Sequence, residues 1–138
     1  MADKIRLRIV TPTRLLIDEE VDEVTAPGVM GEFGVLPNHI AFLTLLVPGE
    51  ISYKQAMTKH YLAVSGGYAE VLNNVMTVLA TAAEFASDIN TNQARQAKEI
   101  AEKKMEELNY EDKEYNTADI ALRWANARLE VASKEARR

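Results

Sequence analysis

Glycine and proline are confined to the first half of this chain, and that distribution limits the folds open to it. All 4 prolines and all 6 glycines lie before residue 68 of a chain of 138 residues. The charged residues are distributed the other way, with 16 in residues 1–87 and 21 in residues 88–138. A segment punctuated by turn residues, followed by a charged and alanine-rich segment, predicts a β domain over 1–87 and helices over 88–138.

The first half has the period of β-strands. In residues 4–10, apolar and basic side chains alternate, which gives one buried and one solvated face. Residues 61–83 predict two strands joined at Asn73–Asn74, because asparagine tolerates the positive φ of a tight hairpin turn. Gly66–Gly67 interrupts the first of these strands, as a bulge or a sharp bend would. Further breaks recur roughly every ten residues, so we expect a sandwich or barrel of short antiparallel strands.

The second half has the period of α-helices. Apolar side chains three and four residues apart form one stripe over residues 94–108, and Asn90 with Gln93 suits the N-cap and capping box of that helix. A second helix is expected to begin with Asn116 as its N-cap and Asp119 in its first turn. That helix carries two apolar stripes: Ala118, Leu122, Ala125, Leu129, Ala132 and Ala136 form one, and Ile120, Trp124, Ala127 and Val131 form the other. An antiparallel helical hairpin uses the first stripe, so the second needs another partner.

Composition argues against several classes of function. The net charge is −5 and the isoelectric point is about 5.1, which argues against a broad nucleic-acid-binding face. The absence of cysteine excludes disulfide frameworks and thiolate metal sites. The first residues carry charge where a signal peptide would place its apolar block, and no apolar run approaches the roughly 20 residues that span a bilayer. We therefore expect a protein that reaches a membrane only through another protein.

The sequence contains no recognisable catalytic or metal-binding constellation. His39 and His60 are the only imidazoles, and because neither lies at a metal-ligand spacing, His39 is better explained as a loop or interface residue. The two glycines of GEFG (residues 31–34) are better explained as turn residues than as a dinucleotide-binding loop, because Pro37 follows them. The acidic residues 18–23 are better explained as a solvated strand edge than as an acid–base pair. We expect no enzyme activity, no metal and no cofactor.

Three segments, taken in order, resemble the ε subunit of F-type ATP synthase. The segment GEFGVLPNHIAFLTLLVPGEI (residues 31–51), with RIVTP before it and YLAVSGGYAEV after it, has the family's pattern G-E-x-G-x-x-P-x-H, an apolar run with threonine, P-G and a strand ending in S-G-G. Asn38 stands where glycine is usual, and Ala41 where proline is common. A charged tail of the right length extends the match over nearly the whole chain. The resemblance implies an N-terminal ten-stranded antiparallel β-sandwich (1–87) and a C-terminal antiparallel two-helix hairpin (88–138).

The same resemblance implies a place in the enzyme complex. The chain would be a non-catalytic subunit of the central stalk, or rotor, which couples the proton-driven c-ring to the γ subunit and the catalytic α and β subunits. The expected γ contacts are His39, Ile40, Phe42 and Thr44. The expected c-ring contacts are Met30, Gly31 and Glu32. The implied location is peripheral, on the cytoplasmic face of a bacterial inner membrane or the stromal side of a plastid thylakoid membrane.

The resemblance also implies that residues 88–138 regulate the enzyme. Packed on the sandwich they would be silent, and extended along γ into the catalytic hexamer they would block ATP hydrolysis. The residues expected to carry this role are Ile120, Arg123, Trp124, Arg128 and Val131. From residue 120 onward five cations (Arg123, Arg128, Lys134, Arg137 and Arg138) stand against Glu130 and Glu135, which makes a +3 segment on a −5 chain. Attraction to acidic segments of the catalytic subunits is one explanation, and a solvated helix face with cations near its C-terminal dipole is the other.

Two other classes of function stay open as alternatives. Some members of the family sense ATP with the motif I/L-D-x-x-R-A at the start of the first tail helix. Here INTNQA (residues 89–94) has Asn90 in place of the aspartate and Gln93 in place of the arginine, so we expect no nucleotide-binding residues. Arg95 does not replace the missing arginine, because it lies two residues after position 93 and so roughly 200° further around the helix. A small β-sandwich enzyme or sugar binder would need convergent polar residues, which the sequence does not offer.

Overall fold

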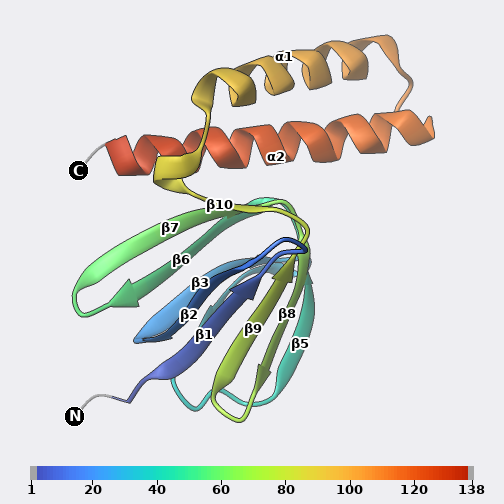
Figure 1. Ribbon diagram of the computed structural model, residues 1–138. Helices are drawn as coiled ribbons and strands as arrows, with labels where there is room; N and C mark the ends of the chain where they lie inside the picture. The colour runs from blue at the N-terminus through green and yellow to red at the C-terminus, as the bar shows by residue number, and fades with distance from the viewer. Residues whose placement is uncertain (1–2, 137–138) are drawn as a thin grey trace.

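A computed structural model describes residues 3–136 of the chain, with the backbone alone for residues 135 and 136. Ten strands are followed by a short 3₁₀ helix and two α-helices (Figure 1). The strands are β1 (Ile5–Val10), β2 (Leu15–Val21), β3 (Glu23–Gly28), β4 (Gly31–Val35), β5 (Phe42–Leu46), β6 (Gly49–Gln55), β7 (Thr58–Val64), β8 (Gly67–Leu72), β9 (Val75–Ala80) and β10 (Ala83–Phe85). The helices are η1 (Ala86–Asp88), α1 (Thr91–Glu107) and α2 (Lys113–Ala136). The predicted β-sandwich followed by a helical hairpin is confirmed.

The sheet order departs from the expected antiparallel pattern at one place. The strands follow the order β10-β7-β6-β3-β5-β8-β9-β1-β2, and β4 pairs with β3. Of these pairs, β1 and β9 are parallel, with Arg6 opposite Val75, whereas the other pairs are antiparallel. A parallel pair needs a long connection. The chain between β1 and β9 contains the seven strands β2 to β8, so no local sequence pattern predicts that these two strands pair.

The alternation predicted for the first strand is confirmed, and it defines the core. Ile5, Leu7 and Ile9 are fully buried, and the basic residues between them are exposed. The core cluster extends through strands β1 to β9 and includes Leu62 and Met76. Because each strand contributes alternate side chains, the sandwich closes around one apolar interior.

The Asn73–Asn74 turn is confirmed, and the predicted interruption at Gly66–Gly67 is present, as a break between two strands and not as a bulge within one. Asn73 and Asn74 both have positive φ, 52° and 62°, as a two-residue hairpin turn requires. The two glycines, by contrast, separate β7 from β8 rather than bulging one strand, so residues 61–83 belong to several strands. Gly67 has φ 136°, and a Cβ there would come 2.0 Å from the carbonyl oxygen of Leu79. The backbone of Gly67 lies so close to its neighbour β9 that there is no room for a side chain at the start of β8.

The two glycines of GEFG have different roles. Gly31 has φ 122° and follows the tight turn between β3 and β4, as predicted. Gly34 lies within β4, with Thr25 as its partner on β3, so it is not a turn residue. The prediction therefore holds for Gly31 and fails for Gly34.

The helix starts agree with the sequence at one helix and not at the other. Asn90 caps α1, since its Oδ1 accepts from the backbone N of Gln93 across 3.0 Å. The Gln93 side chain does not complete the expected capping box, because its Oε1 accepts from Arg128 instead. Helix α2 begins at Lys113, one turn before the predicted cap at Asn116, because the connecting loop already forms a backbone hydrogen bond from Tyr115 N to Asp112 O.

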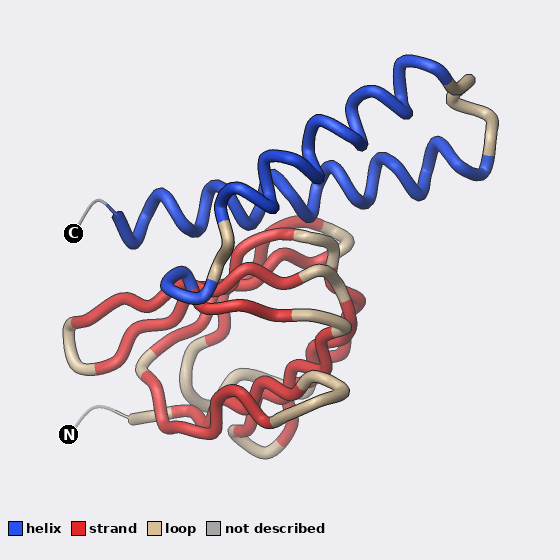
Figure 2. Tube along the Cα trace, turned by 45° about the horizontal axis from the view of Figure 1, so that its top comes forward, coloured by secondary structure: helices blue, strands red, loops and turns tan. Residues whose placement is uncertain are grey.

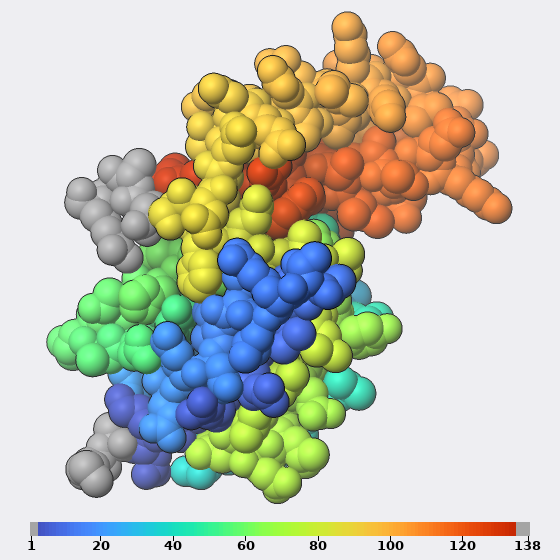
Figure 3. Space-filling model, viewed as in Figure 1, coloured from blue at the N-terminus to red at the C-terminus, as the bar shows by residue number. Residues whose placement is uncertain are grey.

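Helix α2 lies between α1 and the sandwich (Figures 1 and 2). The predicted alanine seam is buried between the helices, including Ala94, Ala101, Ala118 and Ala125. The second stripe covers the sandwich only in part: Val131 is fully buried, but Ile120 is 43 % exposed. The reason is that the hairpin overhangs the sandwich at its loop end (Figure 3), and Ile120 lies on the overhanging half of α2. The side chain of Ala136 lies outside the described residues.

Candidate functional site

The predicted c-ring contacts form an exposed tip between β3 and β4. Only Val29 and Met30 separate the two strands, and Met30 is 93 % exposed. A Cβ on Gly28 would come 2.9 Å from the carbonyl oxygen of Gly31, so the turn is tight. The backbone N of Val29 donates to the carbonyl oxygen of Leu45 across 2.9 Å, which ties the tip to β5. The tip presents an apolar side chain and the exposed carboxylate of Glu32 on a stiff support.

The predicted γ contacts begin in the loop of residues 36–41, which connects β4 to β5. His39 is held inside it, since its backbone N donates to Leu36 O across 3.1 Å and its Nδ1 lies 2.7 Å from Ile40 O. The His39 ring meets the ring of Phe42 edge to face, with centroids 5.9 Å apart. Ile40 is 78 % exposed. This loop, called the docking loop below, therefore offers an ordered apolar surface.

Strand β5 places both of its predicted γ contacts on its inward face. Phe42 and Thr44 lie on the side of the buried Leu46, and Thr44 is half-buried, with its hydroxyl donating to Leu45 O. The outward side chains are Leu43, which is 69 % exposed, and Leu45. The γ contacts predicted on this strand are thus its inward residues, and its outward ones were not among the predicted contacts.

The outward side chains of β5 continue into a row of apolar residues across the sheet. Leu45 pairs with Tyr68, Tyr68 with Leu79, Leu79 with Val10, and Val10 with Leu15. Directly paired residues of a sheet share a face. The exposed row therefore crosses five strands, β5-β8-β9-β1-β2, and is called the outer row below. A shallow hollow lined by Tyr68, Leu79 and Pro12, among others, lies along it.

A polar row runs beside the outer row. It consists of Glu70, Thr77, Arg8 and Asp18, which are successive partners across β8, β9, β1 and β2. Asp18 accepts from Arg6 Nε across 2.7 Å, and this hydrogen bond from the guanidinium lowers the pKa of the Asp18 carboxyl. An apolar strip with a polar border is the usual composition of a protein–protein interface.

The acidic residues 18–23 lie on the edge strand β2, its connection and the first residue of β3; Glu19 and Glu20 are exposed, as predicted for a solvated edge, whereas the other three carboxylates form ion pairs. Asp18 forms ion pairs with Arg6 and Arg8. Asp22 forms an ion pair with Lys4, and the hydrogen bond from Lys4 lowers the pKa of Asp22. These carboxylates hold neighbouring strands together and offer no acid–base pair.

One signal in the sequence could have located the outer row. In an antiparallel sheet with one solvated face, the sequence of each strand alternates between apolar and polar residues. In β8 and β9 apolar side chains occupy both faces, because Tyr68, Leu72 and Leu79 are exposed while Ala69 and Val78 are buried. The core covers the apolar side chains on one face of such a strand, and those on the other face need a second surface to cover them.

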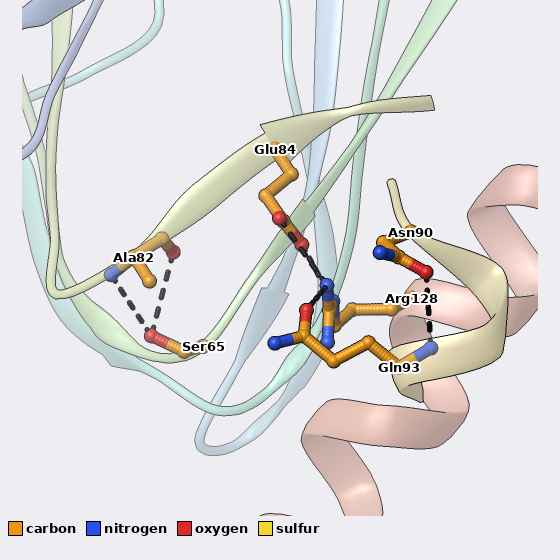
Figure 4. A network of polar contacts seen from close by, with 6 residues as sticks. All are labelled: Ser65, Ala82, Glu84, Asn90, Gln93 and Arg128. Carbon is orange, nitrogen blue, oxygen red and sulfur yellow. Dashed lines mark hydrogen bonds and ion pairs between the residues drawn. The ribbon is translucent and has the colours of Figure 1, made fainter. Parts of the chain in front are cut away.

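The tail forms a second candidate site, where α2 meets the sandwich (Figure 4). Arg128 of α2 is 7 % exposed and donates from Nε to Glu84 Oε1 across 2.6 Å and from Nη2 to Gln93 Oε1 across 3.1 Å. Glu84 belongs to β10 and Gln93 to α1. The guanidinium also lies 5.7 Å from the centroid of the Trp124 ring. One side chain therefore joins both helices to the last strand, and this set is called the Arg128 clamp below.

Apolar contacts and a second ion pair surround the clamp. Val131, Ala132 and Trp124 of α2 pack against a sandwich-side cluster of Tyr61, Ala63, Ala86 and Ile89. Lys134 Nζ pairs with Glu50 of β6 and lies 5.2 Å from the Tyr61 ring. Arg123 is exposed, and Arg137 and Arg138 lie outside the described residues. Of the predicted tail residues, Trp124, Arg128 and Val131 meet at the sandwich, whereas Ile120 and Arg123 do not.

The described residues offer little for catalysis or ligand binding. No group of three or more His, Cys, Asp or Glu among residues 3–134 could hold a metal ion. Ser65 accepts from the backbone N of Ala82 across 3.0 Å, which makes it a structural residue at a strand junction (Figure 4). A hollow of about 700 Å³ between the helices is lined mainly by Ala97, Ile100, Leu108 and Ala118. None of the described helices is long and apolar enough to cross a membrane.

Comparisons with known proteins agree over the length of the chain. Residues 4–86 match the β-sandwich domain of the ATP synthase delta/epsilon chain, and residues 87–133 match its long α-helix domain. The ATP synthase epsilon chain of Geotalea daltonii is 46 % identical over 138 residues, which is 100 % of both chains. That of Syntrophobacter fumaroxidans is 48 % identical over 134 residues, 97 % of this chain and 99 % of the relative.

Two solved structures share the fold. One is a chain in the mitochondrial ATP synthase of Euglena gracilis, a structure of OSCP, F1 and c-ring, with a TM-score of 0.79 and 25 % identity over 94 % of this chain and 81 % of that one. The other comes from the central stalk and c-ring of the Tetrahymena thermophila mitochondrial ATP synthase, with a TM-score of 0.60 and 13 % identity over 98 % of this chain and 96 % of that one.

Proposed function

The chain belongs to the ATP synthase delta/epsilon family as an epsilon chain, a non-catalytic subunit, and on that premise we propose that it is a rotor subunit with a regulatory tail. The sandwich would join the γ subunit to the c-ring on the cytoplasmic or stromal face of the membrane. The tail would inhibit ATP hydrolysis by the α and β subunits when it extends. Torque must pass between ring and shaft, and a closed sandwich supplies a stiff connection.

The outer row carries the docking part of this proposal. Exposed apolar residues scattered singly are normal, but a contiguous row across five strands marks an interaction site. The docking loop lies at one end of β5, and the β3–β4 tip is tied to the other end through Leu45. Two partners can therefore be held at once, γ along the outer row and docking loop and the c-ring at the tip.

The tail's contacts support a brake that can be released. Its attachment to the sandwich consists of one small apolar cluster, the Arg128 clamp and the Lys134–Glu50 pair. The same cations would be free for acidic partners in the catalytic subunits after extension. Because the two states would exchange one set of ion pairs for another, their free energies can lie within a few kcal/mol of each other.

A charge in the outer row tests the docking proposal. Leu79→Asp leaves the core unchanged because Leu79 is exposed, and it should weaken binding to γ by at least about 30-fold if that surface is buried in the complex. Met57→Asp, at a 99 % exposed position on the β6–β7 turn, is the matched control. Equal γ binding by wild type and Leu79→Asp would remove this surface from the interface.

Truncation tests the regulatory part of the proposal. Complexes reconstituted with residues 1–87 should hydrolyse ATP faster than complexes with the full chain, because the inhibitory tail is absent. Equal rates would contradict the proposal that the tail inhibits hydrolysis.

A further inference from the structure

The turn between β8 and β9 contacts the docking loop through one side chain. Asn74 Oδ1 accepts from the backbone N of Asn38 across 2.8 Å, and Asn74 Nδ2 donates to the carbonyl oxygen of Lys4 across 2.8 Å. The carbonyl oxygen of Asn74 also accepts from the backbone N of Arg6 across 3.2 Å. The turn, the docking loop and the beginning of β1 therefore meet at a single residue.

Asparagine meets all the requirements of this position, and its nearest substitutes do not. The backbone of Asn74 has φ 62°, which glycine, asparagine and aspartate tolerate. Glycine would keep the turn but lose both side-chain bonds. Aspartate would keep the acceptor for Asn38 but lose the donor to Lys4, since an ionised carboxylate only accepts. Its neighbour Asn73, with φ 52°, makes no side-chain hydrogen bond to the described residues, so the turn alone does not explain an amide at 74.

The residue that Asn74 holds is the one that sets the course of the docking loop. Asn38 has φ 66° and directly precedes His39, whose ring packs against Phe42. Its side chain donates to Asp3 across 3.3 Å, which is a second tie to the start of the chain. The apolar side chains of the loop do not anchor it, because Leu36 and Ile40 are exposed. The loop is held in shape by polar bonds, and its apolar surface stays free for a partner.

We propose that Asn74 is the positioning residue of the docking loop: its amide fixes residues 36–41 against β1 in the conformation that binds γ. A loop that is already ordered loses less conformational entropy on binding than one that orders on contact. Asn74 does not need to touch γ for this effect, since it acts through Asn38. The inference rests on the proposed docking of this loop on γ.

Three variants test the proposal in the full-length chain. Asn74→Gly should speed hydrogen exchange of the Asn38 amide by at least about tenfold and raise the Kd for the γ subunit, measured in F1 lacking this chain, by about 5- to 30-fold. Asn74→Asp should keep the Asn38 amide protected and bind γ within about threefold of wild type. Asn73→Gly makes the same backbone change in the same turn and should change neither quantity.

The outcomes separate the inference from the function on which it rests. A merely structural role would lower the melting temperature of Asn74→Gly without a selective change in Asn38 exchange or γ affinity. Unchanged exchange in Asn74→Gly, or faster exchange with unchanged γ affinity, would overturn the inference. If wild type itself fails to bind γ, the proposed function fails and the inference fails with it. If wild type binds and Leu79→Asp does not, while Asn74→Gly binds like wild type, the inference alone is wrong.

Discussion

Arg128 and Glu84 stand 2.6 Å apart, Nε to Oε1, and join the second helix of the tail to the last strand of the sandwich. The guanidinium is nearly excluded from solvent, whereas the carboxylate is 29 % exposed. Removing one partner of such a pair leaves the other charge poorly solvated, which costs more than a surface pair would. The contact therefore favours the packed state of the tail over any state in which α2 has left.

We expect Arg128→Ala to loosen the tail. Loss of the clamp should destabilise the packed state by about 1–3 kcal/mol, since the partly exposed Glu84 carboxylate loses its partner and Gln93 and Trp124 lose their contacts. Trp124 is the only tryptophan, so acrylamide quenching of its fluorescence reports the opening. Arg123→Ala, at an exposed position of the same helix, is the control. Equal quenching in both variants would show that the clamp does not hold the tail.

Gly67 should tolerate no side chain. A Cβ there would come 2.0 Å from Leu79 O, and its φ of 136° is rarely adopted by L residues. Gly67→Ala should cost more than about 3 kcal/mol or prevent folding. Gly34→Ala is the matched control, because its Cβ would meet nothing closer than Val24 O at 4.0 Å, and it should stay within about 1 kcal/mol. Thermal melting of the two variants decides the matter, and similar melting temperatures would contradict this reading of the β7–β8 junction.

Tyr53 should make the fold sensitive to alkali. Burial, with a smaller contribution from Glu19, raises the pKa of Tyr53 to about 12 from 10.0. The unfolded chain releases this proton first, so the stabilisation is complete below pH 10 and is lost as the pH rises toward 12. Tyr53→Phe has no such proton, so its free energy of unfolding should fall by about 1–2 kcal/mol less than that of wild type between these pH values. Urea unfolding of both proteins at pH 9 and pH 11.5 measures the difference, and parallel losses would refute the assignment.

The start of α1 should behave as a helix cap and not as a nucleotide site. Asn90 Oδ1 is occupied by Gln93 N, and Gln93 Oε1 by Arg128. Calorimetry with millimolar ATP should show no saturable micromolar binding. Asn90→Ala should instead lower stability by about 1 kcal/mol, as the loss of an N-cap does. Micromolar ATP binding that Asn90→Ala abolishes would restore the ATP-sensing alternative.

Local patterns predicted most of the fold. The alternation in residues 4–10, the asparagine turn and the alanine seam each depend on neighbours in sequence, and each is present in the structure. The parallel pairing of β1 with β9 is absent from every local pattern, because it joins residues as distant as Arg6 and Val75. The start of α2 was misplaced because the Tyr115–Asp112 hydrogen bond continues the helix backward from Asn116.

The candidate site was harder to predict than the fold, for two physical reasons. A strand shifted by one residue exchanges its two faces, so finding that Leu43 and not Thr44 faces outward needs the register and not only the motif that named Thr44 as a γ contact. Charge alone does not reveal its partner either. Arg128 was expected either to attract acidic segments of the catalytic subunits or to lie on a solvated helix face, and in the packed tail it is buried and pairs with Glu84, 44 residues away. Whether it also meets those subunits after extension stays a prediction.

The parallel pair of β1 and β9 sets the order in which the molecule can assemble. The first hairpin is made early in synthesis but has its second neighbour only when β9 exists, so the sandwich closes through distant contacts and should fold in milliseconds to seconds rather than microseconds. The tail helices form locally and fast, and the strands that receive α2 pair with one another, β6 with β7 and β7 with β10, at the end of the strand order away from the β1–β9 pair. Because α2 contacts the sandwich at that end, the tail can leave it without breaking the β1–β9 pair that closes the fold.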